Sequence, residues 1–124
     1  DVCQRLGLTP LCYLWEEDQL LLLDSMISAG IEAIIIKVAS LGLNIEHLGK
    51  SIKEMRDHLI KINLKWGSHI CGEGGEFETF VLDCPLFKKR ISICSEPKII
   101  KNGIDSTVAP VAFLKLENLK LVEK

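Results

Sequence analysis

The first part of the chain contains apolar residues at helical spacing. Residues 1–8 (DVCQRLGL) have the pattern of a helix end, with Gly7 where helices commonly stop. Residues 16–30 (EEDQLLLLDSMISAG) begin with acidic side chains, which favour the positive end of a helix dipole, and stop at Gly30. We therefore predict a helix end within 1–8 and a complete helix over 16–30.

A second helical pattern covers residues 51–67. Ser51 and Glu54 have the spacing of a capping box, in which each side chain accepts a hydrogen bond from the backbone of the other. Gly67 follows the last apolar position. The apolar positions form one stripe, made of Ile52, Met55, Leu59 and Ile62. We predict a helix that begins after Ser51, ends at Gly67 and buries this stripe.

Two segments of the first half have the composition of strands. Residues 9–15 (TPLCYLW) predict a short strand after Pro10, and residues 31–40 (IEAIIIKVAS) form a nearly continuous, β-branched apolar run. Such runs are typical of a parallel strand that is covered on both faces. Strand and helix then alternate twice, so we predict a βαβα first half.

In the second half of the chain, apolar and polar residues alternate with a period of two. Residues 78–82 and 87–93 flank a turn (DCPL) and predict an antiparallel hairpin. Residues 97–103 predict another short strand. Residues 111–124 predict a strand with a bulge near Asn118, where the alternation slips by one position.

Together these elements describe an α/β protein with a mixed sheet, in which a βαβα first half is followed by antiparallel hairpin strands. We predict a single domain over residues 1–124, since no repeat or linker divides the chain and its 48% apolar composition is enough for a core. A buried strand at 33–38 requires neighbours on both sides. We therefore expect a partner, either a missing half of the protein or a second copy in a homo-oligomer.

Charge and composition exclude several classes of protein. A formal net charge of −2 gives no basic surface of the kind that binds nucleic acid. The apolar runs are far shorter than the roughly 20 residues of a membrane span, and no signal peptide is recognisable. Five cysteines without a CxxC pair favour reduced thiols in the cytosol. We predict a cytoplasmic protein without membrane or direct nucleic-acid contacts.

Single residues with reactive or bulky side chains have a structural interpretation first. His47, His58 and His69 show no metal-ligand spacing, and we expect His58 on the solvated side of its helix. His69 lies just before residues 71–80, and donation from it to a glutamate there is one alternative. Trp15 follows a predicted strand, which favours burial of its ring, with lining of a pocket between this chain and a missing half as the alternative.

Residues 71–80 (CGEGGEFETF) combine three glycines with three glutamates. The glycines, which permit positive φ and close approach to a ligand, are Gly72, Gly74 and Gly75. The carboxylates are Glu73, Glu76 and Glu78. Neighbouring carboxylates near a surface repel one another by on the order of a few kcal/mol. One interpretation is a tight turn with solvated glutamates. The other is a site for a cation (Mg²⁺, ammonium or an organic cation), to which Phe77 and Trp66 offer aromatic faces.

The order of residues excludes two nucleotide-binding loops. The Lys and Ser/Thr of GxxxxGK[ST] are absent, and carboxylates would repel phosphates. A GxGxxG fingerprint is excluded because glutamates stand where a pyrophosphate would approach. If strand geometry begins by Glu76, the side chains of Glu76 and Glu78 share one face of that strand.

Several stretches together resemble the diphthine–ammonia ligase family, whose members complete diphthamide synthesis. GEGGEFETFVLDCPLFKK is similar to the signature stretch of that family. LGLTPLCYLW, then MISAGIEAIIIKVASLGL with HLGK, and finally APVAFLKL match further blocks in the same order. The resemblance extends over essentially the whole chain. The family often has Tyr where this chain has Phe77, so a hydroxyl at this position is not required.

The resemblance implies an activity for a full-length protein. The family resembles the N-type ATP pyrophosphatases: ATP adenylates the carboxylate of diphthine, a modified histidine on translation elongation factor 2, and ammonia displaces AMP to form the amide. The family's ATP-binding, SGGxDS-like loop has no counterpart in these residues. We therefore expect the C-terminal, substrate-recognising part of an enzyme, inactive by itself. ATP would be bound mainly by the absent N-terminal half, with Mg²⁺ as a further candidate cofactor.

The resemblance and the electrostatics together imply a site in residues 72–79. Diphthine carries a trimethylammonium group near its reacting carboxylate, and such a cation suits carboxylates and aromatic rings. We predict Glu73 and Glu76 closest to this cation or to the incoming ammonia, and Glu78 as a base or orienting group. The predicted substrate-binding residues are Gly72, Gly74, Gly75, Phe77, Thr79 and Trp15. The alternative function is a non-enzymatic module that recognises the elongation factor without activating it.

Overall fold

The structure, a computed structural model, describes residues 2–101 and 109–124. Its helices are α1 (Val2–Leu6), α2 (Gln19–Ser28), the 3₁₀ helix η1 (Ile45–His47) and α3 (Ile52–Trp66). Its strands are β1 (Glu32–Val38), β2 (Phe77–Asp83), β3 (Lys89–Ile93), β4 (Lys98–Lys101), β5 (Ala112–Lys115) and β6 (Leu119–Glu123). The predicted α/β class is confirmed.

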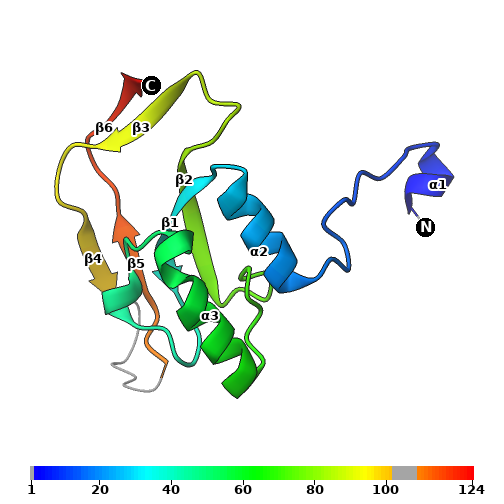
Figure 1. Ribbon diagram of the computed structural model, residues 1–124, viewed down its shortest axis with the longest axis horizontal. Coiled ribbons are helices and arrows are strands. Elements are labelled where there is room, and N and C mark those ends of the chain that lie inside the picture. The colour runs from blue at the N-terminus through cyan, green and yellow to red at the C-terminus, as the bar shows by residue number, and fades with distance from the viewer. Residues whose placement is uncertain (1, 102–108) are drawn as a thin grey trace.

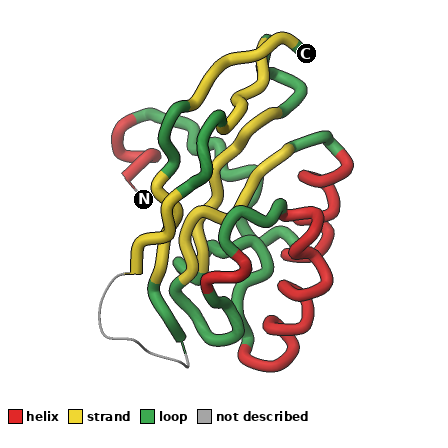
Figure 2. Tube along the Cα trace, turned by 90° about the vertical axis from the view of Figure 1, so that its left-hand side faces the viewer, coloured by secondary structure: helices red, strands yellow, loops and turns green. Residues whose placement is uncertain are grey.

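Helices and strands lie in two layers. In Figure 1, α2 and α3 lie side by side in front of the sheet, while α1 stands apart from the rest of the molecule. Figure 2 shows the same two helices on one side of the strands. Within the two described ranges, no helix is both long enough and apolar enough to cross a bilayer.

All strand pairs of the described residues are antiparallel. β1 lies inside a four-stranded sheet of order β2–β1–β5–β4, and β3 pairs with β6 in a separate ribbon. The prediction of a parallel strand at 31–40 is therefore wrong. The helices cover one face of β1, and Ile34 on the other face lines a cavity together with Ile93 of the ribbon. An apolar run of this kind indicates that both faces of the strand are covered. It does not indicate whether the neighbouring strands run parallel or antiparallel.

The predicted hairpin of 78–82 with 87–93 is also wrong. The turn between these segments forms, with the N–H of Phe87 donating to the carbonyl of Cys84 at 3.0 Å. However, β2 pairs with β1, and β3 pairs with β6. A turn brings two strands near each other, but their partners are chosen by the apolar surface that each can bury.

Residues 9–15, predicted to be a strand, form none. They belong to the N-terminal arm, residues 2–17, in which no side chain is fully buried. The sheet ends at β2 and β4, so these residues have no strand beside them and their backbone is left to water. The predicted burial of the Trp15 ring is wrong too, because Trp15 is 75% exposed.

The helix boundaries follow the predicted signals. The side chain of Asp18 accepts from the N–H of Leu21 at 2.9 Å and caps α2. Both hydrogen bonds of the capping box between Ser51 and Glu54 are present, and Gly67 ends α3 with a φ of 72°. These residues need only their neighbours in sequence, so local pattern is sufficient to find them.

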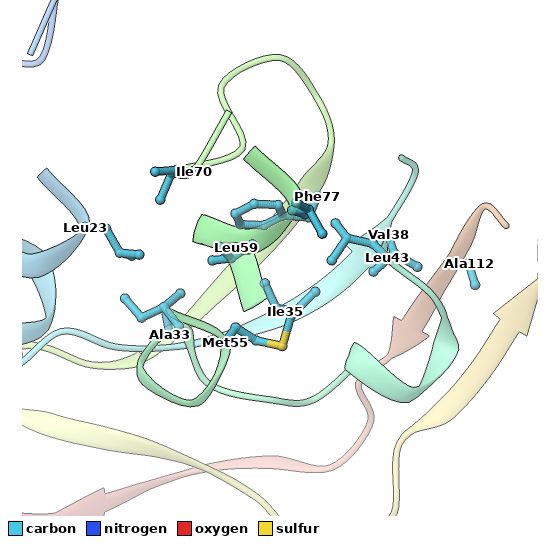
Figure 3. Packing of buried hydrophobic residues seen from close by; sticks show 12 residues of the cluster. Leu23, Ala33, Ile35, Val38, Leu43, Met55, Leu59, Ile70, Phe77 and Ala112 are labelled. Carbon is cyan, nitrogen blue, oxygen red and sulfur yellow. The ribbon is translucent and has the colours of Figure 1, made fainter. Parts of the chain in front are cut away.

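The hydrophobic core lies between the two helices and the sheet. The predicted stripe of α3 is fully buried. Figure 3 shows Met55 and Leu59 of this stripe facing Ile35 of β1, with Leu23 of α2 and Phe77 of β2 at the sides. Phe77 is therefore a core residue as well as the first residue after the glycine-rich loop.

His58 lies against another ring and not in solvent, contrary to the prediction. Its ring stacks on His47 with 4.3 Å between the ring centres, and its Nε2–H donates to the carbonyl of Gly42 at 2.7 Å. The loop that carries His47 folds onto α3 and covers this position. Helical spacing alone could not reveal that loop.

The predicted bulge near Asn118 is a crossing point between the two sheets. Asn118 has a φ of 53°, and the chain leaves β5 in the main sheet before it and enters β6 in the ribbon after it. A residue in the left-handed region of φ turns the chain sharply. This turn explains why the alternation of apolar and polar residues changes phase there.

Candidate functional site

The glycine-rich loop after α3 is a succession of tight turns. The N–H of Gly72 donates to the carbonyl of His69, and the N–H of Gly75 donates to the carbonyl of Gly72, both at 3.0 Å. These two glycines have φ of 76° and 83°, where other residues are strained. A Cβ on Gly74 would lie 2.7 Å from Oε1 of Glu76. The loop backbone thus favours glycine at positions 72 and 75, a side chain at position 74 would displace Glu76, and the approach of the three glycines to a ligand stays a prediction.

The side chain of Glu76 folds back over this loop. Its Oε1 accepts from the backbone N–H of His69 at 2.9 Å, and its backbone carbonyl accepts from Ala39 at 2.9 Å. Its Oε2 is buried and has no hydrogen-bond partner in the described part of the chain. A buried polar atom without a partner costs roughly 1–3 kcal/mol. A ligand N–H that reached this oxygen would remove that cost.

Glu78 lies apart from Glu76, on the face of the sheet away from the helices. The Nζ of Lys37 on β1 donates to its carboxylate at 2.6 Å. Strand geometry begins only at Phe77, so Glu76 precedes the strand. The condition under which Glu76 and Glu78 would share one strand face is therefore not met. A role for Glu78 as a base stays a prediction, and its observed contact is that of an exposed cross-strand ion pair.

Glu73 borders a hollow of about 660 Å³ between the N-terminal arm and α2. Its lining residues include the aromatic residues Tyr13 and Trp15, His69, and the acidic residues Glu16, Glu17 and Glu73. None of the described residues that line it is a Lys or an Arg. Trp15 is among the lining residues, and its alternative role, in a pocket between this chain and a missing half, stays a prediction.

Three residues of this hollow were missed by sequence reasoning. Glu16 and Glu17 were assigned to the first turn of a helix, but α2 begins after its cap Asp18, and both glutamates precede it. Tyr13 was assigned to a strand. Glu16 has a φ of 60°, so the chain turns there, between the arm and the cap of α2. The available signal was the pair of carboxylates beside Tyr13 and Trp15.

His69 is fixed in place by contacts on both sides. The N–H of Cys71 donates to its Nδ1 at 3.1 Å, and its own backbone N–H donates to Glu76. The alternative of donation from His69 to a glutamate is thus realised by its backbone and not by its ring. Its ring lines the same hollow as Glu73.

A smaller cavity of about 230 Å³ lies on the helix side of β2. Phe77, Thr79, Cys71 and Glu73 all line it, and most of its other lining is aliphatic. Burial, and then the charge of Glu73, raise the pKa of the Cys71 thiol. The thiol is therefore held in its protonated, unreactive form, so we assign no nucleophile to it.

The residues of this region do not fit a triphosphate. The hollow is lined by three carboxylates, and the glycine-rich loop carries no Lys or Arg that could pair with phosphate oxygens. No group of three residues that could hold a metal ion occurs within residues 2–101 and 109–124. The arrangement suits a positively charged guest that offers no phosphate.

Residues 18–107 match the family described as the diphthamide synthase C-terminal domain. The whole chain is 53% identical to a diphthine–ammonia ligase of Rattus norvegicus and 51% identical to one of Homo sapiens, and it covers 46% of each of these proteins. A diphthine–ammonia ligase of Schizosaccharomyces pombe is 49% identical over 94% of this chain, which spans 18% of that protein. The chain thus spans less than half the length of these relatives.

Proposed function

The chain belongs to the diphthine–ammonia ligase family, and from this premise we propose that it is the substrate-recognising part of an ATP-dependent ligase. The ligase would join ammonia to the carboxylate of diphthine on translation elongation factor 2 and thereby form an amide. We expect this activity to require more than these 124 residues, because neither the described lining of the hollow nor the glycine-rich loop contains a Lys or Arg that could pair with the triphosphate of ATP. We therefore assign activation of the carboxylate to a portion of the ligase outside this chain.

The observation that carries this proposal is the composition of the hollow. Glu73 lies at its edge beside the rings of Tyr13 and Trp15. A quaternary ammonium cannot donate a conventional N–H hydrogen bond, so proteins hold it with aromatic faces and nearby negative charge, and each cation–π contact is worth about 0.5–2 kcal/mol. The trimethylammonium group of diphthine is a cation of this kind. We assign it to this hollow.

The other two glutamates have different duties in this proposal. Glu76 holds the backbone of His69 through its Oε1, and we assign to its unpartnered Oε2 the acceptance of an N–H from ammonia. Glu78, paired with Lys37, lies on the opposite face of β2 from Thr79. We therefore place the cation at Glu73, with Glu76 as a supporting residue, and assign no substrate contact to Glu78.

A fusion protein tests the proposal. The chain would be joined to the preceding portion of the rat relative and assayed for ATP- and ammonia-dependent amidation of diphthine-bearing elongation factor 2. We expect amidation by the fusion, none by the chain alone, and a loss of at least about tenfold in the variant Glu73→Gln. The variant Glu96→Gln, which changes an exposed glutamate that does not line this hollow, is the matched control.

The alternative, a recognition module without catalysis, has a separate signature. In this alternative, the protein binds the elongation factor but does not activate the carboxylate of diphthine. A fusion that binds ATP and the elongation factor but forms no amide would overturn the proposed ligase role and support this alternative.

A further inference from the structure

Three consecutive backbone N–H groups at the entrance of the glycine-rich loop donate to side chains. The N–H of His69 donates to Oε1 of Glu76 at 2.9 Å, and the N–H of Cys71 donates to Nδ1 of His69 at 3.1 Å. Between them, the N–H of Ile70 donates to Oε1 of Gln19 at 2.9 Å. Glu76 and His69 belong to the same stretch of chain as the groups that they bind. Gln19 lies 51 positions earlier than Ile70, so its side chain joins this stretch to another element.

Gln19 is the first residue of α2, and its main chain makes a second contact with the loop entrance. The thiol of Cys71 donates to the carbonyl of Gln19 at 3.4 Å. The side chain of Asp18 caps the helix at the preceding position, which holds the backbone of Gln19 in place. The side-chain amide of Gln19 is therefore presented by a fixed helix end, and the position of the loop entrance follows that of α2.

Ile70 connects this bond to the hydrophobic core. Its side chain is 6% exposed and belongs to the core cluster with Leu23 of α2 and Phe77 of β2, all three of which are labelled in Figure 3. A part-buried N–H that loses its acceptor is costly, so the backbone at Ile70 would move toward water or another acceptor. Glu73 follows three positions later, beyond a tight turn. A movement at Ile70 would therefore displace Glu73.

We propose that Gln19 is a positioning residue for the glycine-rich loop, and that it sets the place of Glu73 at the hollow by holding the backbone of Ile70. The inference rests on the proposed function, in which Glu73 contacts the trimethylammonium group of diphthine. Gln19 acts through the acceptor oxygen of its side chain and not through contact with the substrate. A loop that is already held in its binding position loses little freedom when the substrate arrives, so Gln19 contributes to binding more than to the chemical step.

Two replacements separate positioning from direct contact, because Gln19 is itself among the residues that line the hollow. Gln19→Glu keeps an oxygen acceptor for the N–H of Ile70 but removes the amide N–H donors. Gln19→Met has a similar length and offers neither an oxygen acceptor nor an N–H donor. If Gln19 positions the loop, Gln19→Met should impair binding and Gln19→Glu should not. A substrate contact made by the amide N–H groups would impair binding in both variants, and this result would overturn the inference.

The fusion with the preceding portion of the rat relative gives the kinetic readout. We expect Gln19→Met to raise KM for diphthine-bearing elongation factor 2 about three- to tenfold, the range expected for the loss of one hydrogen bond, while kcat changes by less than about twofold. Gln19→Glu should have a KM no higher than that of the unmodified fusion. A lowered kcat at unchanged KM in Gln19→Met would contradict a role in binding.

Ile62→Val is the matched control for lowered stability. It shortens a buried side chain of α3 and removes no hydrogen bond of the loop. Its KM should equal that of the unmodified fusion. If this control raises KM as much as Gln19→Met does, the effect of Gln19 is one of general stability and the inference fails.

Amide hydrogen exchange in the isolated chain tests the bond itself. The N–H of Ile70 should exchange faster in Gln19→Met and at an unchanged rate in Gln19→Glu. Unchanged exchange in both variants would exclude the bond, and faster exchange in Gln19→Met with an unchanged KM would leave it a structural role alone. Either result overturns the inference.

A fusion that forms no amide at all would overturn the proposed function, and choline binding by the isolated chain then decides the inference separately. We expect Gln19→Met to weaken choline binding about three- to tenfold, as for KM, and Gln19→Glu to retain it. The inference fails if choline does not bind the unmodified chain, or if Gln19→Met leaves the affinity for choline unchanged.

Discussion

The Oε1 of Glu76 accepts a hydrogen bond from the backbone N–H of His69 at 2.9 Å and thereby ties the end of the glycine-rich loop to its beginning. Repulsion among Glu73, Glu76 and Glu78 was the reason to expect a bound cation. The structure separates the three: Glu76 bonds backbone, Glu78 bonds Lys37, and Glu73 borders the hollow. Of these three glutamates, Glu73 is the one that lines the hollow to which we assign the cation.

The contact between Gly74 and Glu76 predicts a coupled pair of mutations. Gly74→Ala should lower the free energy of unfolding by about 1–3 kcal/mol, because its Cβ would lie 2.7 Å from Oε1 of Glu76. In the background of Glu76→Ala the same change should cost much less. Urea denaturation of the two single variants and the double variant measures the difference. Equal costs in both backgrounds would show that the two side chains do not interact.

Two replacements of Glu76 should differ in their effect on the structure and stability of the loop. Glu76→Gln keeps an oxygen acceptor for the N–H of His69, so the loop should retain its structure. Glu76→Ala leaves that N–H without its partner and should destabilise the chain by about 1–3 kcal/mol. Amide hydrogen exchange at His69 is the measurement: fast exchange is expected in the alanine variant only. Protection that is unchanged in both variants would exclude the bond.

The stacked histidines predict an acid-sensitive stability. Burial, followed by the charge of His58, lowers the pKa of His47 from its usual 6.5, while Glu46 acts in the opposite direction and Lys50 adds to the lowering. Because the unfolded chain then binds more protons than the folded one, the free energy of unfolding should fall as the pH drops below about 7 and through 6.5, until the lowered folded-state pKa is reached.

The variant His47→Asn is the control for this pH dependence. It keeps an acceptor for the N–H of Asn44, to which Nδ1 of His47 is bonded at 3.0 Å, but does not titrate. Chemical denaturation at several pH values between 5 and 8 should show a smaller slope for this variant. Identical slopes would assign the acid sensitivity to other groups.

The N-terminal arm predicts that stability and binding can be separated. Removing residues 1–17 leaves the cap Asp18 in place and takes away no fully buried side chain of the arm. The free energy of unfolding should therefore change by less than about 1 kcal/mol. Tyr13 and Trp15 are lost from the hollow, so binding of a quaternary ammonium such as choline should disappear. Retained binding would place the cation elsewhere.

Within the chain, the features that sequence alone predicted are those that neighbouring residues decide. The capping box of Ser51 and Glu54, the stops at Gly30 and Gly67, and the buried stripe of α3 all involve residues at most a few turns apart. The α/β class and the family follow from such local patterns and from the order of the motifs. Each of these signals lies within a short stretch of the sequence or in the order of such stretches.

Only the tertiary structure decided which strands pair and which side chains meet. The apolar composition of β1 is compatible with parallel and with antiparallel neighbours. The antiparallel direction of its partners could therefore not be inferred from composition. The same holds for the hollow, where Trp15 from the arm meets His69 and Glu73 from a loop more than fifty positions later. Contacts between distant segments depend on how the whole core packs, and no local spacing encodes them.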